Sequence, residues 1–128
     1  LWAKYAGMGD FDQPMHADFE GNTLVYPRDD GDYRQVNIIL YYSDVDATLG
    51  PTHVVSQRHT RNDPLWPPFR PREEYPEIYD LATPIIAKAG GMLIFSMRAF
   101  HRGTAITAAS RTPGISSSTR STSMAKML

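Results

Sequence analysis

The sequence of 128 residues contains no cysteine and no excess of charge of either sign. Without thiols it can form no disulfide scaffold, thiolate zinc site or iron–sulfur cluster, and it has no cysteine nucleophile. Its 13 basic and 14 acidic residues give a net charge of −1. This balance provides no electrostatic footprint for a nucleic acid or an anionic membrane, so we expect neither as a partner.

Long apolar runs are also missing. Near the middle of the chain, the longest stretch without a charged or strongly polar residue covers residues 38–42, which is far too short to span a bilayer. No basic-then-apolar signal segment opens the chain, and we expect a cytoplasmic protein. The first residue is Leu1 rather than Met, so we expect a fragment or a processed chain. No pattern in the sequence indicates the oligomeric state.

The chain is rich instead in turn residues and short apolar runs. Ten prolines and nine glycines separate runs of β-branched and aromatic residues that lack a long 3.6-residue period. We expect strands around His16 and at residues 36–42, 52–55 and 92–97. Gly90-Gly91 predicts a hairpin-type turn between residues 85–88 and the last of these strands. Short strands at this spacing predict an all-β sandwich or barrel.

Two segments differ from this pattern. Residues 63–77 contain five prolines, which remove ladder donors, and predict a long surface loop with a short helical turn at residues 72–81. Residues 110–123 are mostly Ser and Thr, a composition that cannot offset the entropy cost of folding. We therefore expect a folded unit over residues 1–109 and a disordered tail over residues 110–128.

The residues best suited to chemistry are the His16-Ala17-Asp18 motif and His101, which lies 85 positions after His16. In a strand, side chains at i and i+2 point to the same face, so His16 and Asp18 can converge on one ion, with a third ligand from a distant strand. Two imidazoles and one carboxylate leave adjacent positions open, as in non-heme Fe(II) oxygenases, whereas four ligands close a structural zinc site. The bare motif is also compatible with a surface His and Asp at a strand edge.

Other polar and aromatic side chains have simpler explanations. A structural or surface role is expected for His53 and His59. Acidic neighbours in the same loop favour a solvated face over an anion site for Arg58, Arg61, Arg70 and Arg72. Four aromatic residues could line a pocket, although aromatic residues in strands are more often part of the core: Tyr41, Tyr42, Trp66 and Phe69. A hydrolase is not supported, because no acid–base partner stands at motif spacing from Ser56 or Ser96.

Three longer segments extend the motif: QPMHADF at residues 13–19, VNIILYYSDVDATLGPTHVVSQRH at residues 36–59 and AKAGGMLIFSMRAFHRGT at residues 87–104. In this order they resemble the phytanoyl-CoA dioxygenase family of Fe(II)/2-oxoglutarate oxygenases. That family has H-x-D on an early core strand and then a strand that ends in Asp before a Gly-Pro turn. A glycine turn, an apolar strand and a distal His follow. The resemblance covers about residues 9–109.

The resemblance implies a mainly β fold, a double-stranded β-helix, which is a jelly-roll barrel with the metal in its mouth. It implies that His16, Asp18 and His101 hold Fe(II), and that 2-oxoglutarate and O₂ are used to hydroxylate an unactivated C–H bond of a small organic substrate. An oxygen ligand from Asp18 occupies the place that a halide would need, which favours hydroxylation over halogenation. The family's arginine for the far carboxylate of 2-oxoglutarate corresponds to Arg111.

The chain departs from the family pattern at several positions. Met92 stands where an acidic residue usually follows the glycine turn, and Gln57-Arg58-His59 replaces Gly-Ser-His. Residues 112–114 are Thr-Pro-Gly where an apolar strand belongs, and the family's N-terminal region is missing. We therefore expect a barrel that is incomplete at both ends and a weak or inactive enzyme. The alternative function is a non-catalytic jelly-roll binding module or an inactive fragment with a vestigial metal site. A cupin-like isomerase ranks last, because the cupin histidine pair and glutamate are missing.

Overall fold

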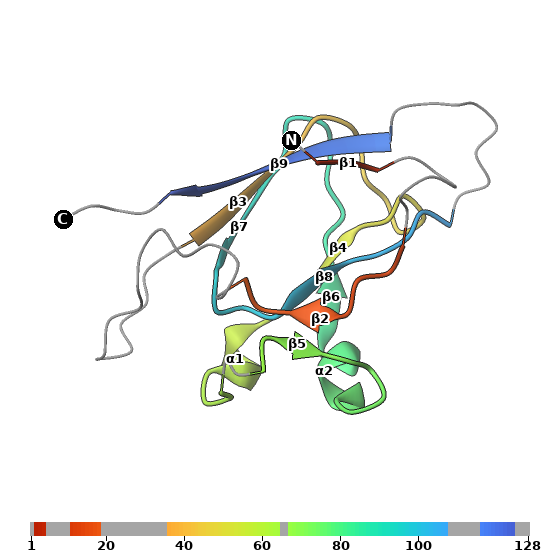
Figure 1. Cartoon of the computed structure of the whole chain (residues 1–128). Helices are drawn as coiled ribbons and strands as arrows, with labels where there is room; N and C mark the ends of the chain where they lie inside the picture. Colours follow the sequence, from red (N-terminus) through yellow and green to blue (C-terminus); the bar gives the residue numbers. More distant parts are fainter. Residues whose placement is uncertain (1, 5–10, 19–35, 65–66, 108–115, 125–128) are drawn as a thin grey trace.

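Two antiparallel β-sheets dominate the computed structural model of the chain, which describes residues 2–4, 11–18, 36–64, 67–107 and 116–124 (Figure 1). The four-stranded sheet has the order β1 (Trp2–Lys4), β9 (Ser116–Met124), β3 (Val36–Tyr41) and β7 (Met92–Ser96). The five-stranded sheet has the order β5 (Phe69–Arg70), β2 (Met15–His16), β8 (His101–Gly103), β4 (Thr52–Val55) and β6 (Ala82–Pro84). The expected mainly β fold is confirmed.

The helices of the described residues, α1 (Gln57–Thr60) and α2 (Pro76–Asp80), are short and lie at the end of the molecule that carries β2 and β5 (Figure 1). Neither has the length and apolarity needed to cross a membrane. Proline stands in the first turn of α2, where its missing N–H has no partner to lose. This helix lies within the helical turn that the sequence predicts at residues 72–81.

Four expected strands are present. β2 contains His16, β4 covers residues 52–55, and β3 and β7 cover most of residues 36–42 and 92–97. All four are short runs with apolar residues bounded by turns, so local propensity is enough to predict them. Residues 19–26, which follow the strand expected around His16, lie outside the described residues.

The expected hairpin at Gly90-Gly91 is wrong, because the strands before and after it belong to different sheets. β6 pairs with β4, and the residues between β6 and the turn make a single bridge from Ala87 to Val45. The turn pairs instead with the end of β3: the Gly90 N–H donates to the Tyr41 carbonyl, and the Tyr41 N–H donates to the Gly91 carbonyl. Gly90 has a φ of +82°, which glycine adopts without strain. The turn therefore carries the chain from one sheet to the other.

β9 lies within the segment for which the sequence predicts a disordered tail. It inserts between β1 and β3, with residues from Thr119 to Met124 in register with Tyr41 to Val36. A run of Ser and Thr cannot build a core alone, but it can complete a sheet when β3 supplies backbone partners. The expected disorder therefore does not extend over these nine residues. The expected boundary at residue 109/110 lies outside the described residues.

The proline-rich segment contains a strand, β5, where the sequence predicts only loop. β5 pairs with β2, and Arg70 stands opposite Met15. Arg70 is buried, with 6% of its surface exposed, which corrects the expectation of a solvated side chain. Its Nε donates to the Pro67 carbonyl (3.0 Å) and its Nη2 to the Pro64 carbonyl (2.6 Å). The guanidinium supplies donors that prolines lack, and it thereby holds the loop against β2.

The hydrophobic core lies between the five-stranded sheet and α2. The cluster buried there, called the hydrophobic core below, consists of Met15, Ala17, Val55, Ile78 and Phe100. Other apolar residues are buried outside this cluster: Tyr41, Val45, Phe95, Met97 and Ala99. Side chains alternate along a strand, so His16, between Met15 and Ala17, points to the opposite face. The same alternation turns His101, which follows Phe100, away from the core. Packing of the apolar residues therefore aims both histidines toward the four-stranded sheet.

We expect Arg70→Ala to lower the free energy of unfolding by about 2–4 kcal/mol. The guanidinium also lies 4.5 Å from the centroid of the Tyr75 ring and 5.1 Å from that of Phe100, so the change removes packing as well as two hydrogen bonds. Urea unfolding followed by circular dichroism measures the loss. Arg61→Ala, at an exposed arginine, is the matched control and should change stability by less than about 0.5 kcal/mol. Equal small changes in both variants would contradict the role given to Arg70.

Candidate metal centre

Three side chains that can bind a metal meet on the face of the five-stranded sheet that points away from the core. His16 on β2 lies directly opposite His101 on β8, and Asp18 follows two residues after His16 on the same face. One ligand atom from each lies within 4.8 Å of the other two. Among the described residues this is the only such group of His, Asp and Glu side chains. The structure therefore brings together the residues singled out from the sequence, and their binding of a metal stays a prediction.

Both imidazoles present Nε2 to the carboxylate. Nε2 of His16 lies 3.6 Å from Oδ1 of Asp18, and Nε2 of His101 lies 3.5 Å from Oδ2. On the other side of each ring, Nδ1 of His16 is 2.9 Å from the Pro14 carbonyl oxygen and Nδ1 of His101 is 3.1 Å from that of Ala99. Since a carbonyl only accepts, each Nδ1 donates its hydrogen and each neutral ring keeps a lone pair on Nε2. Metal-binding histidines are usually held in this way.

The donor set fits Fe(II). Two imidazole nitrogens and one carboxylate oxygen form the facial set of non-heme iron oxygenases. Metal–ligand bonds of about 2.1 Å at right angles place neighbouring ligand atoms about 3 Å apart. The observed nitrogen–oxygen distances of 3.5 and 3.6 Å, each to a different oxygen of Asp18, exceed this by about half an ångström. The two lone pairs and the carboxylate also favour a cation between them.

Burial controls the charge of His101, which is 7% exposed. Burial lowers the pKa of His101; the charge of Asp18 opposes this shift, and the neighbouring His16 adds to it. The pKa therefore lies below the ordinary value of about 6.5, and the imidazole is neutral at pH 7. The neutral form is the one that binds metals, so folding prepares His101 as a ligand.

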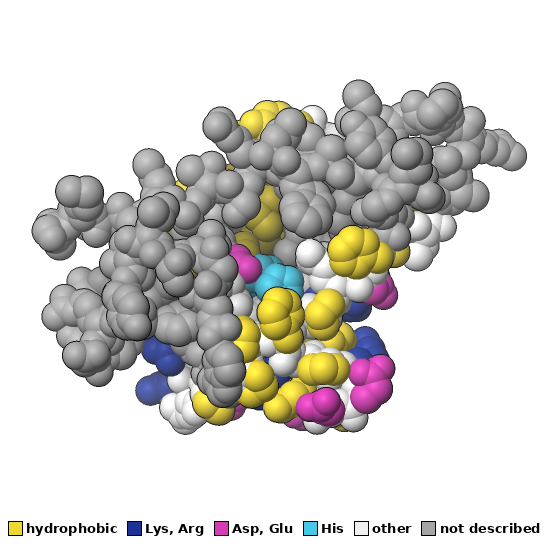
Figure 2. Space-filling view, viewed as in Figure 1, with side chains coloured by type: hydrophobic (Ala, Val, Ile, Leu, Met, Phe, Trp, Pro, Cys, Tyr) yellow, Lys and Arg dark blue, Asp and Glu magenta, His cyan; other side chains and the backbone are white. Residues whose placement is uncertain are grey.

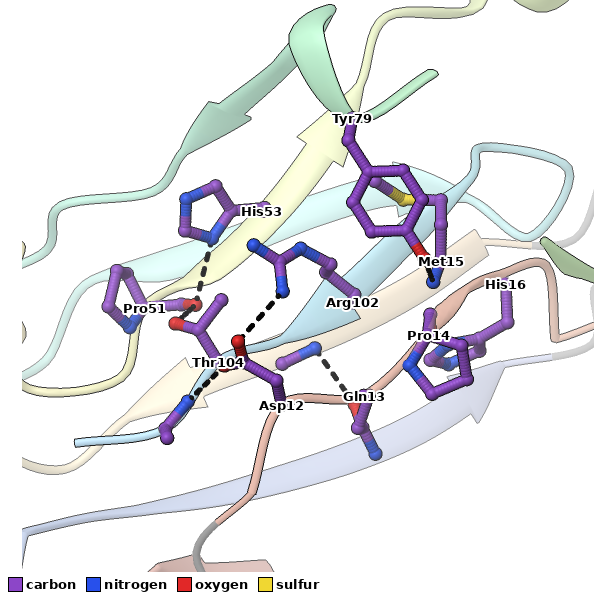
Figure 3. A network of polar contacts seen from close by, with 12 residues as sticks. Asp12, Gln13, Pro14, Met15, His16, Pro51, His53, Tyr79, Arg102 and Thr104 are labelled. Carbon is purple, nitrogen blue, oxygen red and sulfur yellow. Dashed lines mark hydrogen bonds and ion pairs between the residues drawn. The ribbon is translucent and has the colours of Figure 1, made fainter. Parts of the chain in front are cut away.

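Polar contacts made by the two residues before β2, Asp12 and Gln13, fix the register between β2 and β8 (Figure 3). The Gln13 N–H donates to the Gly103 carbonyl (2.9 Å), and the Gly103 N–H donates to Oε1 of Gln13 (2.8 Å). Asp12 accepts from the Ala105 N–H (2.7 Å), and its other oxygen lies 3.5 Å from Nη1 of Arg102. A slip of one residue would turn the histidines toward the core. These contacts therefore preserve the geometry of the centre.

The hydroxyl of Tyr79 on α2 fixes the other edge of β2. It accepts from the Met15 N–H (2.9 Å) and donates to the Arg70 carbonyl (2.7 Å), as Figure 3 shows for Met15. Both backbone groups lie next to the pair formed by His16 and Phe69. Tyr79 was not predicted from the sequence, because nothing local indicates that a helical tyrosine reaches a strand 64 residues earlier.

Two side chains of the four-stranded sheet contact the centre and were not predicted either. Asn37 on β3 is 1% exposed and donates from Nδ2 to Oδ2 of Asp18. Phe95, its register partner on β7, packs edge-on against His101 with 4.7 Å between the ring centroids. A polar residue within an apolar strand was the available signal for Asn37. The sequence offered no signal for Phe95, because an apolar strand predicts burial but not the neighbour.

An aromatic side chain flanks the centre on its exposed side. Phe69 stands opposite His16 in the register of β5 and β2, with 5.8 Å between the ring centroids. It is 59% exposed, so it is a surface residue and not part of the core. Figure 2 shows a histidine and an acidic side chain with hydrophobic side chains next to them on this face. Of the other aromatic candidates, Tyr41 is buried and Tyr42 is exposed.

The remaining candidates lie elsewhere or outside the described residues. His53 stands opposite Arg102 on the face away from the centre, and its Nδ1 lies 3.3 Å from the Pro51 carbonyl oxygen. His59 is exposed on α1. Arg111 and Trp66 lie outside the described residues, so the role of Arg111 stays a prediction.

A sequence model of the family described as phytanoyl-CoA dioxygenase (PhyH) matches residues 1–112. The matched range covers most of the chain and contains His16, Asp18, His101 and Arg111. No curated protein matches the chain significantly.

We expect the metal-free protein to lose stability as the pH falls below about 6.5. Because the pKa of His101 is lowered on folding, the unfolded chain takes up a proton that the folded state does not bind until the pH reaches the lower, folded-state pKa. Above about pH 6.5 the residue is neutral in both states and the effect disappears. Urea unfolding between about pH 5 and 8 measures the slope. His101→Gln does not titrate in this range, so its curve should be flatter, and an unchanged slope would contradict this explanation.

Proposed function

The chain belongs to the phytanoyl-CoA dioxygenase family, and from this premise we propose that it is an Fe(II)- and 2-oxoglutarate-dependent dioxygenase. The reaction proposed is hydroxylation of an unactivated C–H bond in a small organic substrate. Membership implies an oxygenase that uses O₂ and a small molecule. The observation that carries the proposal is the convergence of His16, Asp18 and His101 within 4.8 Å.

The three side chains would hold Fe(II) on one face and leave the opposite positions open. When bound, the metal supplies the redox chemistry by which O₂ and 2-oxoglutarate are consumed, with succinate and CO₂ as products of the co-substrate. His16 and His101 would bind the metal through Nε2, and the backbone carbonyls of Pro14 and Ala99 orient the two rings through Nδ1. Asp18 provides an oxygen ligand where halogenation needs room for a halide, which supports hydroxylation.

The strand order supports the finer proposal of a double-stranded β-helix. From β1 to β4, and again from β6 to β9, successive strands belong alternately to the four-stranded and the five-stranded sheet. A jelly roll is built from two facing sheets that exchange consecutive strands in this manner. In such a fold the His16–His101 pair would lie between the sheets, at the mouth of the barrel.

The surroundings of the centre support an organic substrate with an apolar part. Phe69 presents an aromatic ring that is 59% exposed beside His16, although folding tends to bury such surface. The Arg70 guanidinium holds the segment that carries this ring. An exposed aromatic side chain beside a candidate metal centre is suited to contact a ligand.

We expect anaerobic addition of Fe(II) and 2-oxoglutarate to give a weak visible charge-transfer band. Binding is the chosen measurement because the departures of the sequence from the family pattern predict weak turnover. Asp18→Ala should lose the band and keep the fold, since the carboxylate lies outside the hydrophobic core. Asp80→Ala removes an exposed carboxylate at the end of α2 and should retain the band.

Thermal unfolding of the same variants separates the possible outcomes. If Asp18→Ala unfolds as it loses the band, Asp18 is a structural residue and the proposed ligand set is wrong. If the folded wild-type protein gives no band, the alternative function is favoured, either a non-catalytic jelly-roll module or an inactive fragment with a vestigial metal site.

We also propose that Arg111 pairs with the far carboxylate of 2-oxoglutarate. β9 begins at Ser116, so the chain beyond Arg111 leads into a strand and is not wholly without regular structure. Arg111→Ala should weaken binding of 2-oxoglutarate to the Fe(II)-loaded protein by about 10–100-fold, the range expected for a charge-assisted pair. Arg111→Lys keeps the charge but lacks the planar guanidinium, so its affinity for 2-oxoglutarate should lie between those of the wild type and Arg111→Ala. Isothermal titration measures the affinities, and equal values for all three proteins would exclude Arg111 as the anchor.

A further inference from the structure

We propose that Asn37 is a positioning residue, which holds the Asp18 carboxylate so that one of its oxygens is presented to the metal. This inference rests on the proposed metal centre and assigns to it a residue from the opposite sheet. Asn37 lies on β3 in the four-stranded sheet, whereas the three candidate ligands belong to β2, β8 and the residues that follow β2.

The hydrogen bond between the two side chains has a defined direction. An ionised carboxylate can only accept, so the amide must turn Nδ2 toward Asp18 and Oδ1 away from it. Nδ2 donates to Oδ2 of the carboxylate. Oδ1 of Asp18 stays on the side of His16, 3.6 Å from Nε2. Oδ2 also lies 3.5 Å from Nε2 of His101, so each oxygen faces one imidazole, but only Oδ2 accepts a hydrogen bond from the amide. The amide in this way makes the two oxygens of Asp18 unequal before any metal binds.

Packing alone does not explain an amide at this position. Asn37 is 1% exposed, and its Oδ1 has no hydrogen-bond partner among the described residues. Burial of an acceptor without a partner destabilises a fold, whereas an apolar side chain of similar size would avoid this loss. The next residues on the same face of β3 are Ile39 and Tyr41, so the strand itself favours an apolar or aromatic side chain here. The bond to Asp18 is what the amide contributes.

The contact matters because an unrestrained Asp carboxylate can bind a metal through one oxygen or through both. Binding through both would occupy a position that the co-substrate or O₂ needs. A hydrogen bond to Oδ2 competes with binding through that oxygen and favours the one-oxygen arrangement. Phe95, which pairs with Asn37 in the register of β3 and β7, packs edge-on against the His101 ring. Neighbouring residues of one sheet therefore orient two of the three ligands on the other.

The test uses Co(II) alone as the probe, because its visible spectrum reports the number and kind of ligands. In Asn37→Leu the donor is lost and the buried Oδ1 is removed with it. We expect Co(II) affinity to fall by about 10–100-fold, as is usual when a partner of a metal ligand is removed. We also expect a changed visible spectrum at saturation and a melting temperature no lower than that of the wild type. If Asn37 had only a structural role, its replacement would not lower Co(II) affinity while the melting temperature is maintained.

Asn37→Ala and Ile39→Ala form a matched pair of truncations on one face of β3, and they replace the test if Asn37→Leu does not fold. Asn37→Ala should lose affinity and change the spectrum, whereas Ile39→Ala should lose stability but bind Co(II) as the wild type does. Wild-type affinity and spectrum in folded Asn37 variants would overturn the inference and leave the metal centre intact. Equal loss of affinity in Ile39→Ala would also overturn it. Failure of the wild-type protein to bind Co(II) would instead overturn the proposed function.

Discussion

The pairing of β2 with β8, which sets His16 opposite His101, is the constraint on which the rest of the structure depends. β2 has only two residues, so its own ladder cannot define the register strongly. Gln13 on one side and the Tyr79 hydroxyl on the other supply the missing contacts. Because side chains alternate along the strand, the same register buries Met15 and exposes His16 to the opposite sheet. Core packing and the candidate metal centre therefore cannot be changed independently.

The two sheets have different tasks at the centre. The five-stranded sheet carries the candidate ligands, and the four-stranded sheet covers them with Asn37 and Phe95. Burial of His101 under this cover lowers its pKa and keeps the imidazole neutral, which is the state that a metal requires. A centre between two sheets is thus available only after both have formed and packed together. The fold couples metal binding to tertiary structure in this way.

The proline-rich segment illustrates how a loop becomes part of a site. Prolines lack N–H donors, so this segment cannot build regular structure from its own backbone. The buried guanidinium of Arg70 provides donors to two of its carbonyls and packs between aromatic rings. This arrangement allows β5 to pair with β2 and places Phe69 beside His16. Arg70, for which the sequence predicted a solvated side chain, therefore holds the segment that lies beside the candidate centre.

The sequence by itself determined the features that follow from local geometry. Short runs of β-branched and aromatic residues predicted β3, β4 and β7, and the i, i+2 spacing placed His16 and Asp18 on one face. The family resemblance indicated His101 as the distal ligand; the structure places it opposite His16, and its binding of a metal stays a prediction. Tertiary structure decided which strands pair. In the structure, the turn at Gly90 connects the two sheets and forms no hairpin, and part of the Ser/Thr-rich segment pairs with β3 as β9. Arg70 is buried, and Asn37 donates a hydrogen bond to Asp18. The reason is physical: a local pattern encodes alternation and turn preference, whereas partners arise from contacts between segments that are far apart in the chain and become neighbours only when the sheets assemble.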